Sequence, residues 1–158
     1  MQEVNIYIET DIPPMKCRRG NVIYVLETMT SKGPATVSSM IPMENATQNR
    51  ITLEALEEAL ERMSRLCHIT IWTDCNYVAN ALRNRWLDQW KQNGWKNSKG
   101  EEICDVASWQ ESARLAALHT VTVMPNKGSS YQDWMKTELR RANKDVFYSG
   151  VKKPFHSE

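Results

Sequence analysis

The chain has 158 residues, of which 41% are hydrophobic and 25% are charged, which is enough for one packed core and short for two. Its formal net charge of +1 excludes a strongly basic protein, so any charged surface for nucleic acid must be local. The first residues carry acids and no run reaches the roughly 20 apolar residues of a membrane span, so we expect a cytoplasmic protein without a signal peptide or a membrane partner.

Three strands are predicted at the beginning of the chain. Residues 4–9 alternate apolar and polar side chains, which is typical of a half-buried strand. Residues 21–30 and 34–43 are rich in β-branched and apolar side chains and flank the turn sequence of residues 31–33. The pattern predicts antiparallel strands joined by a tight turn.

The remainder of the chain predicts helices alternating with single strands. Apolar residues recur every three or four positions over 49–66, which indicates an amphipathic helix with Thr47 as its N-cap. The later elements are expected as a strand at 68–73, helices near 76–82, 85–92 and 103–117, a strand at 120–124 and a last helix from about 130 to 142. We expect one domain over residues 1–143 and a tail over residues 144–158 that is poorly ordered or packed along an edge.

Two motifs resemble type 1 ribonuclease H. Residues 70–96, TIWTDCNYVANALRNRWLDQWKQNGWK, resemble its TD-x-x-YV motif and the W-x-x-x-W-x-x-x-GWK segment that follows. Residues 47–56, TQNRITLEAL, resemble its T-x-N-R-x-E-L-x-A-L helix start. The resemblance implies an α/β protein of the ribonuclease H-like fold, with a five-stranded mixed sheet, the element order βββαβαααβα and flanking helices. It also implies cleavage of the RNA strand of an RNA–DNA hybrid with Mg²⁺ or Mn²⁺.

Asp74 and Glu9 are the predicted metal ligands. Asp74 follows a β-branched strand, and α/β folds place chemistry at strand carboxyl ends. The resemblance makes Asp74 a metal ligand; the alternative is an N-cap of the next helix. Glu9 stands where the family has its first Asp, with Asp11 as a reserve candidate, and the alternative is a solvated acid at a strand end.

The family's other two carboxylate positions are neutral here. Thr52 and Thr137 stand at these positions by resemblance, and Asp133, one helical turn before Thr137, is the candidate substitute. Two metal ions in such a site stabilise the attacking and leaving oxygens, and a hydroxyl does not replace an anionic ligand. The sequence therefore predicts a weakened catalytic site.

The predicted binding residues are amides, cations and one indole. The resemblance places Asn49, Arg50 and Asn76 against nucleic acid, and cations with aromatic side chains suit a sugar–phosphate groove. The candidates in the following basic segment are Lys91, Trp95, Lys96 and Lys99, whereas Trp86 and Trp90 are expected to form a structural apolar stripe. Three hypotheses remain: a metal-dependent hybrid ribonuclease, a catalytically degenerate nucleic-acid-binding module, and a protein-interaction domain on the same fold.

Overall fold

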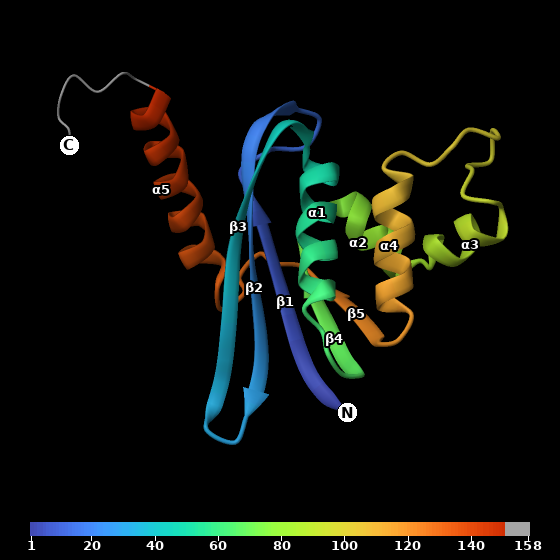
Figure 1. Cartoon of the computed structure of the whole chain (residues 1–158), viewed down its shortest axis with the longest axis horizontal. Helices are drawn as coiled ribbons and strands as arrows, with labels where there is room; N and C mark the ends of the chain where they lie inside the picture. The colour runs from blue at the N-terminus through green and yellow to red at the C-terminus, as the bar shows by residue number, and fades with distance from the viewer. Residues whose placement is uncertain (151–158) are drawn as a thin grey trace.

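A computed structural model describes residues 1–150, with side chains through residue 144. It contains one mixed five-stranded sheet in the order β3-β2-β1-β4-β5 (Figure 1). The strands are β1 (Gln2–Thr10), β2 (Cys17–Thr30), β3 (Gly33–Thr47), β4 (Cys67–Trp72) and β5 (Thr120–Met124). β1, β2 and β3 are antiparallel neighbours, and β4 and β5 continue the sheet parallel to β1. The predicted α/β fold and strand set are confirmed.

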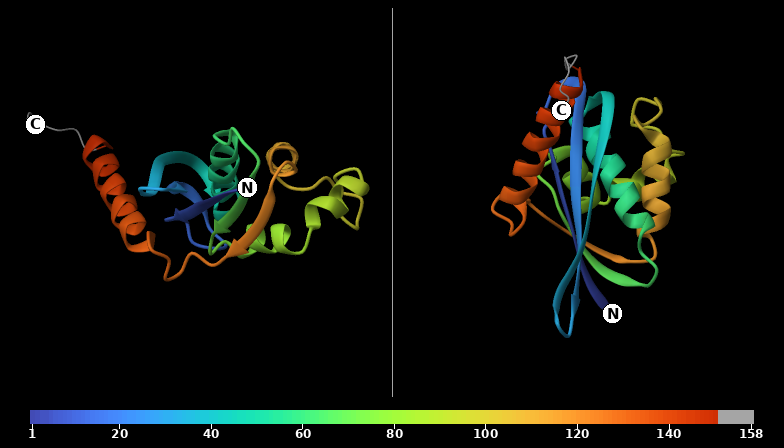
Figure 2. Two further views of the ribbon diagram at one scale, coloured as in Figure 1. Left: turned by 90° about the horizontal axis from the view of Figure 1, so that it is seen from below. Right: turned by 60° about the vertical axis from the view of Figure 1, so that its left-hand side comes forward.

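Helices cover both faces of the sheet. The helices are α1 (Gln48–Glu61), α2 (Asn76–Arg83), α3 (Trp86–Gln92), α4 (Val106–Ala116) and α5 (Gln132–Gly150). Figure 2 shows α1 and α4 on one side of the sheet and α5 on the other, while α3 lies beyond α4, at the end of the molecule opposite α5. None of the helices in residues 1–150 is long and apolar enough to cross a membrane.

The period-2 pattern of β1 divides its side chains between two cores. Val4, Ile6 and Ile8 join the larger core beneath α1, α2 and α4. Tyr7 faces the other way, into a smaller cluster with Met135 and Leu139 of α5. Alternation therefore directs Glu9 to the same face as Tyr7, toward α5.

Three helix boundaries differ from the prediction. α1 begins after Thr47, whose hydroxyl accepts the Arg50 backbone N–H at 3.1 Å, which confirms the predicted cap, but the helix ends at Glu61. α4 begins only at Val106, because Asp105 takes a left-handed conformation (φ 59°) that breaks the expected first turn. α5 continues to Gly150, past the expected end near residue 142. Of the expected tail, residues 151–158 lie outside the described part of the chain.

Candidate functional site

Two carboxylates meet at the carboxyl ends of the parallel strands β1 and β4. The strand register pairs Tyr7 with Trp72, so Glu9 and Asp74 stand side by side two residues further along each chain. They line a hollow of about 40 Å³, which has room for a few water molecules or one hydrated ion. The other lining residues are Ile8, Thr10, Gln48, Thr52, Thr73 and Cys75.

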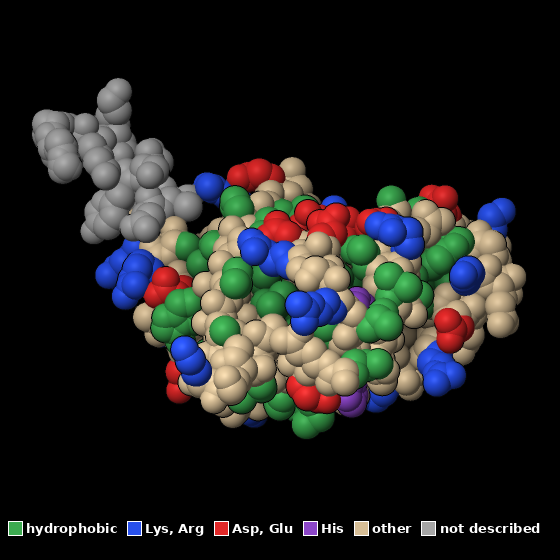
Figure 3. All heavy atoms as spheres, turned by 60° about the horizontal axis from the view of Figure 1, so that its bottom comes forward, with side chains coloured by type: hydrophobic (Ala, Val, Ile, Leu, Met, Phe, Trp, Pro, Cys, Tyr) green, Lys and Arg blue, Asp and Glu red, His purple; other side chains and the backbone are tan. Residues whose placement is uncertain are grey.

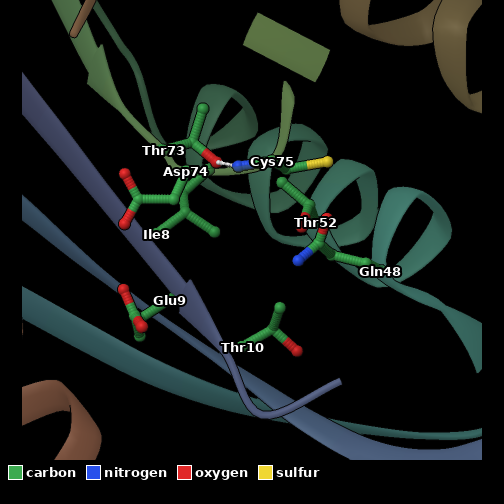
Figure 4. A pocket seen from close by; sticks show the side chains of 8 residues that line it. All are labelled: Ile8, Glu9, Thr10, Gln48, Thr52, Thr73, Asp74 and Cys75. Carbon is green, nitrogen blue, oxygen red and sulfur yellow. Dashed lines mark hydrogen bonds between the residues drawn. The ribbon is translucent and has the colours of Figure 1, made fainter. Parts of the chain in front are cut away.

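The two carboxylate groups point the same way. Figure 4 shows Glu9 and Asp74 turned to one side of the hollow, while Thr52, Gln48 and Cys75 gather on the other. The side to which the carboxylates turn is that of the segment between β5 and α5, because their hydrogen-bond donors come from this segment. The hollow is thus anionic on one side and neutral on the other.

Asn126 contacts both acids from the end of β5. Its side-chain amide donates to Glu9 Oε1 at 2.7 Å, and its backbone N–H donates to Asp74 Oδ1 at 2.9 Å. The backbone N–H of Lys127 adds a second bond to Asp74 Oδ1 at 3.1 Å. Asn126 is fully buried and Glu9 is half-buried, whereas Asp74 is exposed, so the bond to Glu9 is the one that offsets a cost of burial. Asp74 is held by these bonds, whereas the N-cap of α2 is Cys75, so Asp74 does not cap that helix.

Gln132, the first residue of α5, bridges the two acids. Its Nε2 lies 3.5 Å from Glu9 Oε1 and 3.4 Å from Asp74 Oδ2. The Gly128 backbone N–H donates to Gln132 Oε1 at 2.9 Å, which fixes the amide with its NH₂ group toward the acids. Both bonds to the acids are long, so this contact is weaker than the contact of Asn126.

The surroundings of Glu9 disfavour its charge. Burial raises the pKa of the Glu9 carboxyl above its ordinary value, and the negative charge of Asp74 adds to this effect. The hydrogen bonds from Asn126 and Gln132 and the positive charge of Lys136 oppose the shift. The ionised form of Glu9 therefore costs folding stability.

Replacing Glu9 by Gln should raise the free energy of unfolding at pH 7.5. The substitute is neutral and still accepts the Asn126 bond. Because the pKa of Glu9 is raised in the folded state, the contribution of Glu9 to wild-type stability falls as pH rises through that pKa. The higher free energy of unfolding of Glu9→Gln should therefore appear in urea denaturation at pH 7.5 and vanish at pH 4. Glu61→Gln at an exposed position is the control, and a less stable Glu9→Gln at pH 7.5 contradicts the prediction.

The three other residues predicted around the metal lie in different settings. Thr52 is 1% exposed and lines the hollow, so α1 delivers this position to the site. Thr137 is exposed, and its hydroxyl donates to the Asp133 carbonyl at 3.0 Å. Asp133 has an exposed side chain, because it follows Gln132 by about 100° around the helix. The structure brings Glu9, Asp74 and Thr52 together, and Gln132 takes the contact expected of Asp133.

Two of the predicted binding residues in α1, Arg50 and Asn49, are engaged within the protein. The Arg50 guanidinium bonds to Ser108 and to Glu54, the latter at 2.9 Å, in the contact between α1 and α4. Asn49 Oδ1 accepts a hydrogen bond from the Cys75 thiol at 3.3 Å. Asn49 and Asn76 line a second hollow of about 470 Å³, which shares Gln48 with the carboxylate hollow. A groove with both polar and apolar lining therefore adjoins the two acids.

The basic segment extends over α3 and the loop after it. Lys91, Lys96 and Lys99 are exposed, whereas Trp95 is half-buried and packs on the larger core. Trp86 and Trp90 also pack on that core, with ring centroids 6.1 Å apart, as expected of a structural stripe. On the face that Figure 3 shows, cations are scattered among acidic side chains and form no continuous band.

The carboxylate ligands at the site suit one divalent ion better than two. Mg²⁺ is commonly held by one or two carboxylates with water completing its shell, and Glu9 and Asp74 supply two. Among the described side chains, no group of three or more His, Cys, Asp or Glu is placed to hold a metal. A pair of adjacent ions needs more anionic oxygen than this site provides.

Asn126 and Gln132 were not predicted from the sequence. Asn126 follows the carboxyl end of β5, which is parallel to β1 and β4, so the strand-end rule that singled out Asp74 applies to it equally. For Gln132 the sequence carries no comparable signal, because its contact depends on the turn of residues 125–131 that sets the start of α5.

The mixed sheet, the helix order and the acids at the ends of β1 and β4 define an α/β domain of the ribonuclease H-like class. A family model described as RNase H matches residues 14–130. The chain therefore belongs to the ribonuclease H family.

Individual proteins agree with this assignment. A ribonuclease H of Caldicellulosiruptor saccharolyticus is 37% identical over 87 residues, which cover 55% of this chain and 60% of that protein. The chain spans about three fifths of the length of the first curated relatives it matches. The crystal structure of LC9-RNase H1, described as a type 1 RNase H with the type 2 active-site motif, matches with a TM-score of 0.72 and 20% identity, over 90% of this chain and 72% of that one.

A viral structure shares the fold as well. The foamy viral protease-reverse transcriptase in complex with an RNA/DNA hybrid matches with a TM-score of 0.61 and 18% identity, over 87% of this chain and 19% of that chain. At these identities the two structures show a common fold.

Proposed function

We propose that this protein binds an RNA–DNA hybrid and slowly hydrolyses its RNA strand, with one divalent ion, Mg²⁺ or Mn²⁺, held by Glu9 and Asp74. The observation that carries the proposal is the meeting of these two acids in a hollow at the carboxyl ends of β1 and β4, in a chain of the ribonuclease H family. The ribonuclease H family generally uses a divalent metal. Such an ion, when bound, supplies positive charge for the phosphate and lowers the pKa of a bound water.

Residues of the protein itself have separate roles in this proposal. Glu9 and Asp74 anchor the ion, and the backbone N–H groups of Asn126 and Lys127 keep Asp74 in place. Gln132 contributes a neutral contact and no charge. Because Thr52 and Gln132 add no negative charge, we expect metal binding and turnover well below those of a four-carboxylate site.

The groove next to the acids supports a nucleic-acid substrate. Its amides, hydroxyls and Lys16 suit sugar and phosphate oxygens, and Pro14, Met15 and Tyr77 supply an apolar part of the lining. The groove opens beside the carboxylate hollow through the shared Gln48. Among the matched structures, the foamy viral protease-reverse transcriptase was solved with an RNA/DNA hybrid. Since α3 lies beyond α4, the basic segment would contact a different part of the duplex from the acids (Figure 2).

Replacing Lys91 and Lys96 together by Ala should weaken binding of an RNA–DNA hybrid about tenfold near physiological salt. Each cation that contacts a phosphate adds about one unit to the slope of log K against log salt, so the slope should flatten by up to about two. Fluorescence anisotropy across a salt series measures both quantities. Lys32→Ala with Arg65→Ala removes the same charge at exposed positions outside the basic segment and outside the groove. An unchanged slope in the Lys91/Lys96 variant argues against this segment as a binding surface.

A second function is favoured by one observation. The amide of Asn126 already occupies Glu9 Oε1 with a 2.7 Å hydrogen bond, and no group of three metal-binding side chains occurs among the described residues. A catalytically degenerate module that binds the hybrid without cleaving it has these features. Binding without metal-dependent cleavage identifies this module, and absence of both activities leaves a protein-interaction domain.

A further inference from the structure

A buried acid lies on the sheet face that α5 covers, outside the carboxylate hollow. Glu27 of β2 is 8% exposed and accepts hydrogen bonds from Asn5 Nδ2 at 2.8 Å and from the Tyr7 hydroxyl at 3.3 Å. A third bond comes from the Tyr131 hydroxyl at 2.5 Å. Three donors satisfy a carboxylate that burial would otherwise make costly.

The partners of Glu27 connect three strands. Asn5 of β1 also accepts the indole N–H of Trp72 of β4 at 2.9 Å. The Tyr7 ring stacks on Trp72 with centroids 5.2 Å apart and meets Tyr131 edge-on at 4.8 Å. Glu27 is therefore the centre of a rigid polar and aromatic cluster that joins β1, β2 and β4 to the segment before α5.

Tyr131 connects the Glu27 cluster to the carboxylate hollow. It directly precedes Gln132, and its carbonyl accepts the Met135 backbone N–H at 2.9 Å, so it starts the first turn of α5. Gln132 is the residue that contacts both acids. The hydrogen bond that the Tyr131 hydroxyl donates to Glu27 raises the pKa of Tyr131 to about 12, so this hydroxyl remains a donor at every physiological pH.

We propose that Glu27 is a positioning residue of the site, which holds Tyr131 and thereby keeps Gln132 against Glu9 and Asp74. Its effect on catalysis rests on the function proposed above, whereas its effect on the position of Gln132 does not. The bond to Glu27 adds to the packing of Met135 and of the Tyr131 ring, which also hold the first turn of α5 near the sheet.

The side-chain amide signals of Gln132 in ¹⁵N-labelled protein report its position directly, and their loss in Gln132→Leu assigns them. Tyr131→Phe keeps the ring but removes the hydroxyl, so these signals should move toward those of a solvated glutamine. Glu27→Gln keeps an acceptor oxygen and should produce a smaller movement. Asn143→Ala, the control, removes a 2.8 Å bond from Asn143 to Asp11 further along α5 and should leave the signals in place.

Signals that stay in place in a folded Tyr131→Phe protein, or that move equally in Asn143→Ala, overturn the proposal. Calorimetric titration with Mn²⁺ separates the positioning proposal from the proposed function. The affinity of the protein for Mn²⁺ should fall about tenfold in Tyr131→Phe. If the wild-type protein neither binds Mn²⁺ nor cleaves the hybrid and yet Tyr131→Phe moves the signals, positioning by Glu27 stands and the proposed function fails. If the wild-type protein cleaves and Tyr131→Phe changes neither the signals nor the affinity, positioning alone fails.

Discussion

Asp74→Asn should reduce metal-dependent cleavage of an RNA–DNA hybrid by about 10³-fold or more, the largest loss expected of any single substitution. The amide keeps the size of the side chain and one acceptor oxygen for the N–H groups of Asn126 and Lys127, so the fold should be retained. It removes one of only two negative charges available to the ion. The measurement is single-turnover cleavage of a hybrid with a labelled RNA strand, in Mg²⁺ and in Mn²⁺.

The matched control for Asp74→Asn is Asp133→Asn. Asp133 lies at the start of α5 with an exposed side chain and does not make the contact that Gln132 makes with the two acids. Its substitution should leave the rate within about twofold, because exposed polar substitutions away from a site have small effects. Equal activity of Asp74→Asn and the wild-type protein would exclude Asp74 from the reaction and point to a contaminating nuclease. A large loss in Asp133→Asn would instead show that α5 shifts when substrate binds.

Strand patterns predicted most of the fold and the centre of the site. The alternation in residues 4–9 and the β-branched run before Asp74 are set by local chemistry, so they identify two strands and their ends from sequence. Because parallel strands end at the same edge, Glu9 and Asp74 follow as neighbours once β1 and β4 are adjacent. The adjacency itself came from the resemblance to type 1 ribonuclease H.

The α5 side of the site depends on geometry that no local pattern specifies. A turn of residues 125–131 decides which residue of α5 meets the acids, and a shift of one residue rotates the helix by about 100°. The sequence therefore suggested Asp133, whereas the structure places Gln132 at the acids. Arg50 illustrates the same limit: its ion pair with Glu54 is local to α1, but its bond to Ser108 depends on how α4 packs against α1.

Thr52→Glu should increase metal-dependent cleavage of the hybrid by about 100-fold, because it returns an anionic ligand to the neutral side of the hollow. Thr52 is buried and lines this hollow with Glu9 and Asp74. The hollow of about 40 Å³ provides space for the longer side chain. A third carboxylate next to the other two would also strengthen the hold on the ion.

The same substitution should lower stability without metal. Burial and Asp74 already raise the pKa of Glu9, and another acid adds repulsion that only a bound cation relieves. The melting temperature of Thr52→Glu should therefore fall below that of the wild-type protein in EDTA and recover as Mg²⁺ is added, since an ion that binds the folded state stabilises it. Thr52→Gln has the same size without the charge and controls for overpacking. If Thr52→Gln gains as much activity as Thr52→Glu, or if neither cleaves while both remain folded, the missing charge at position 52 is not what limits this site.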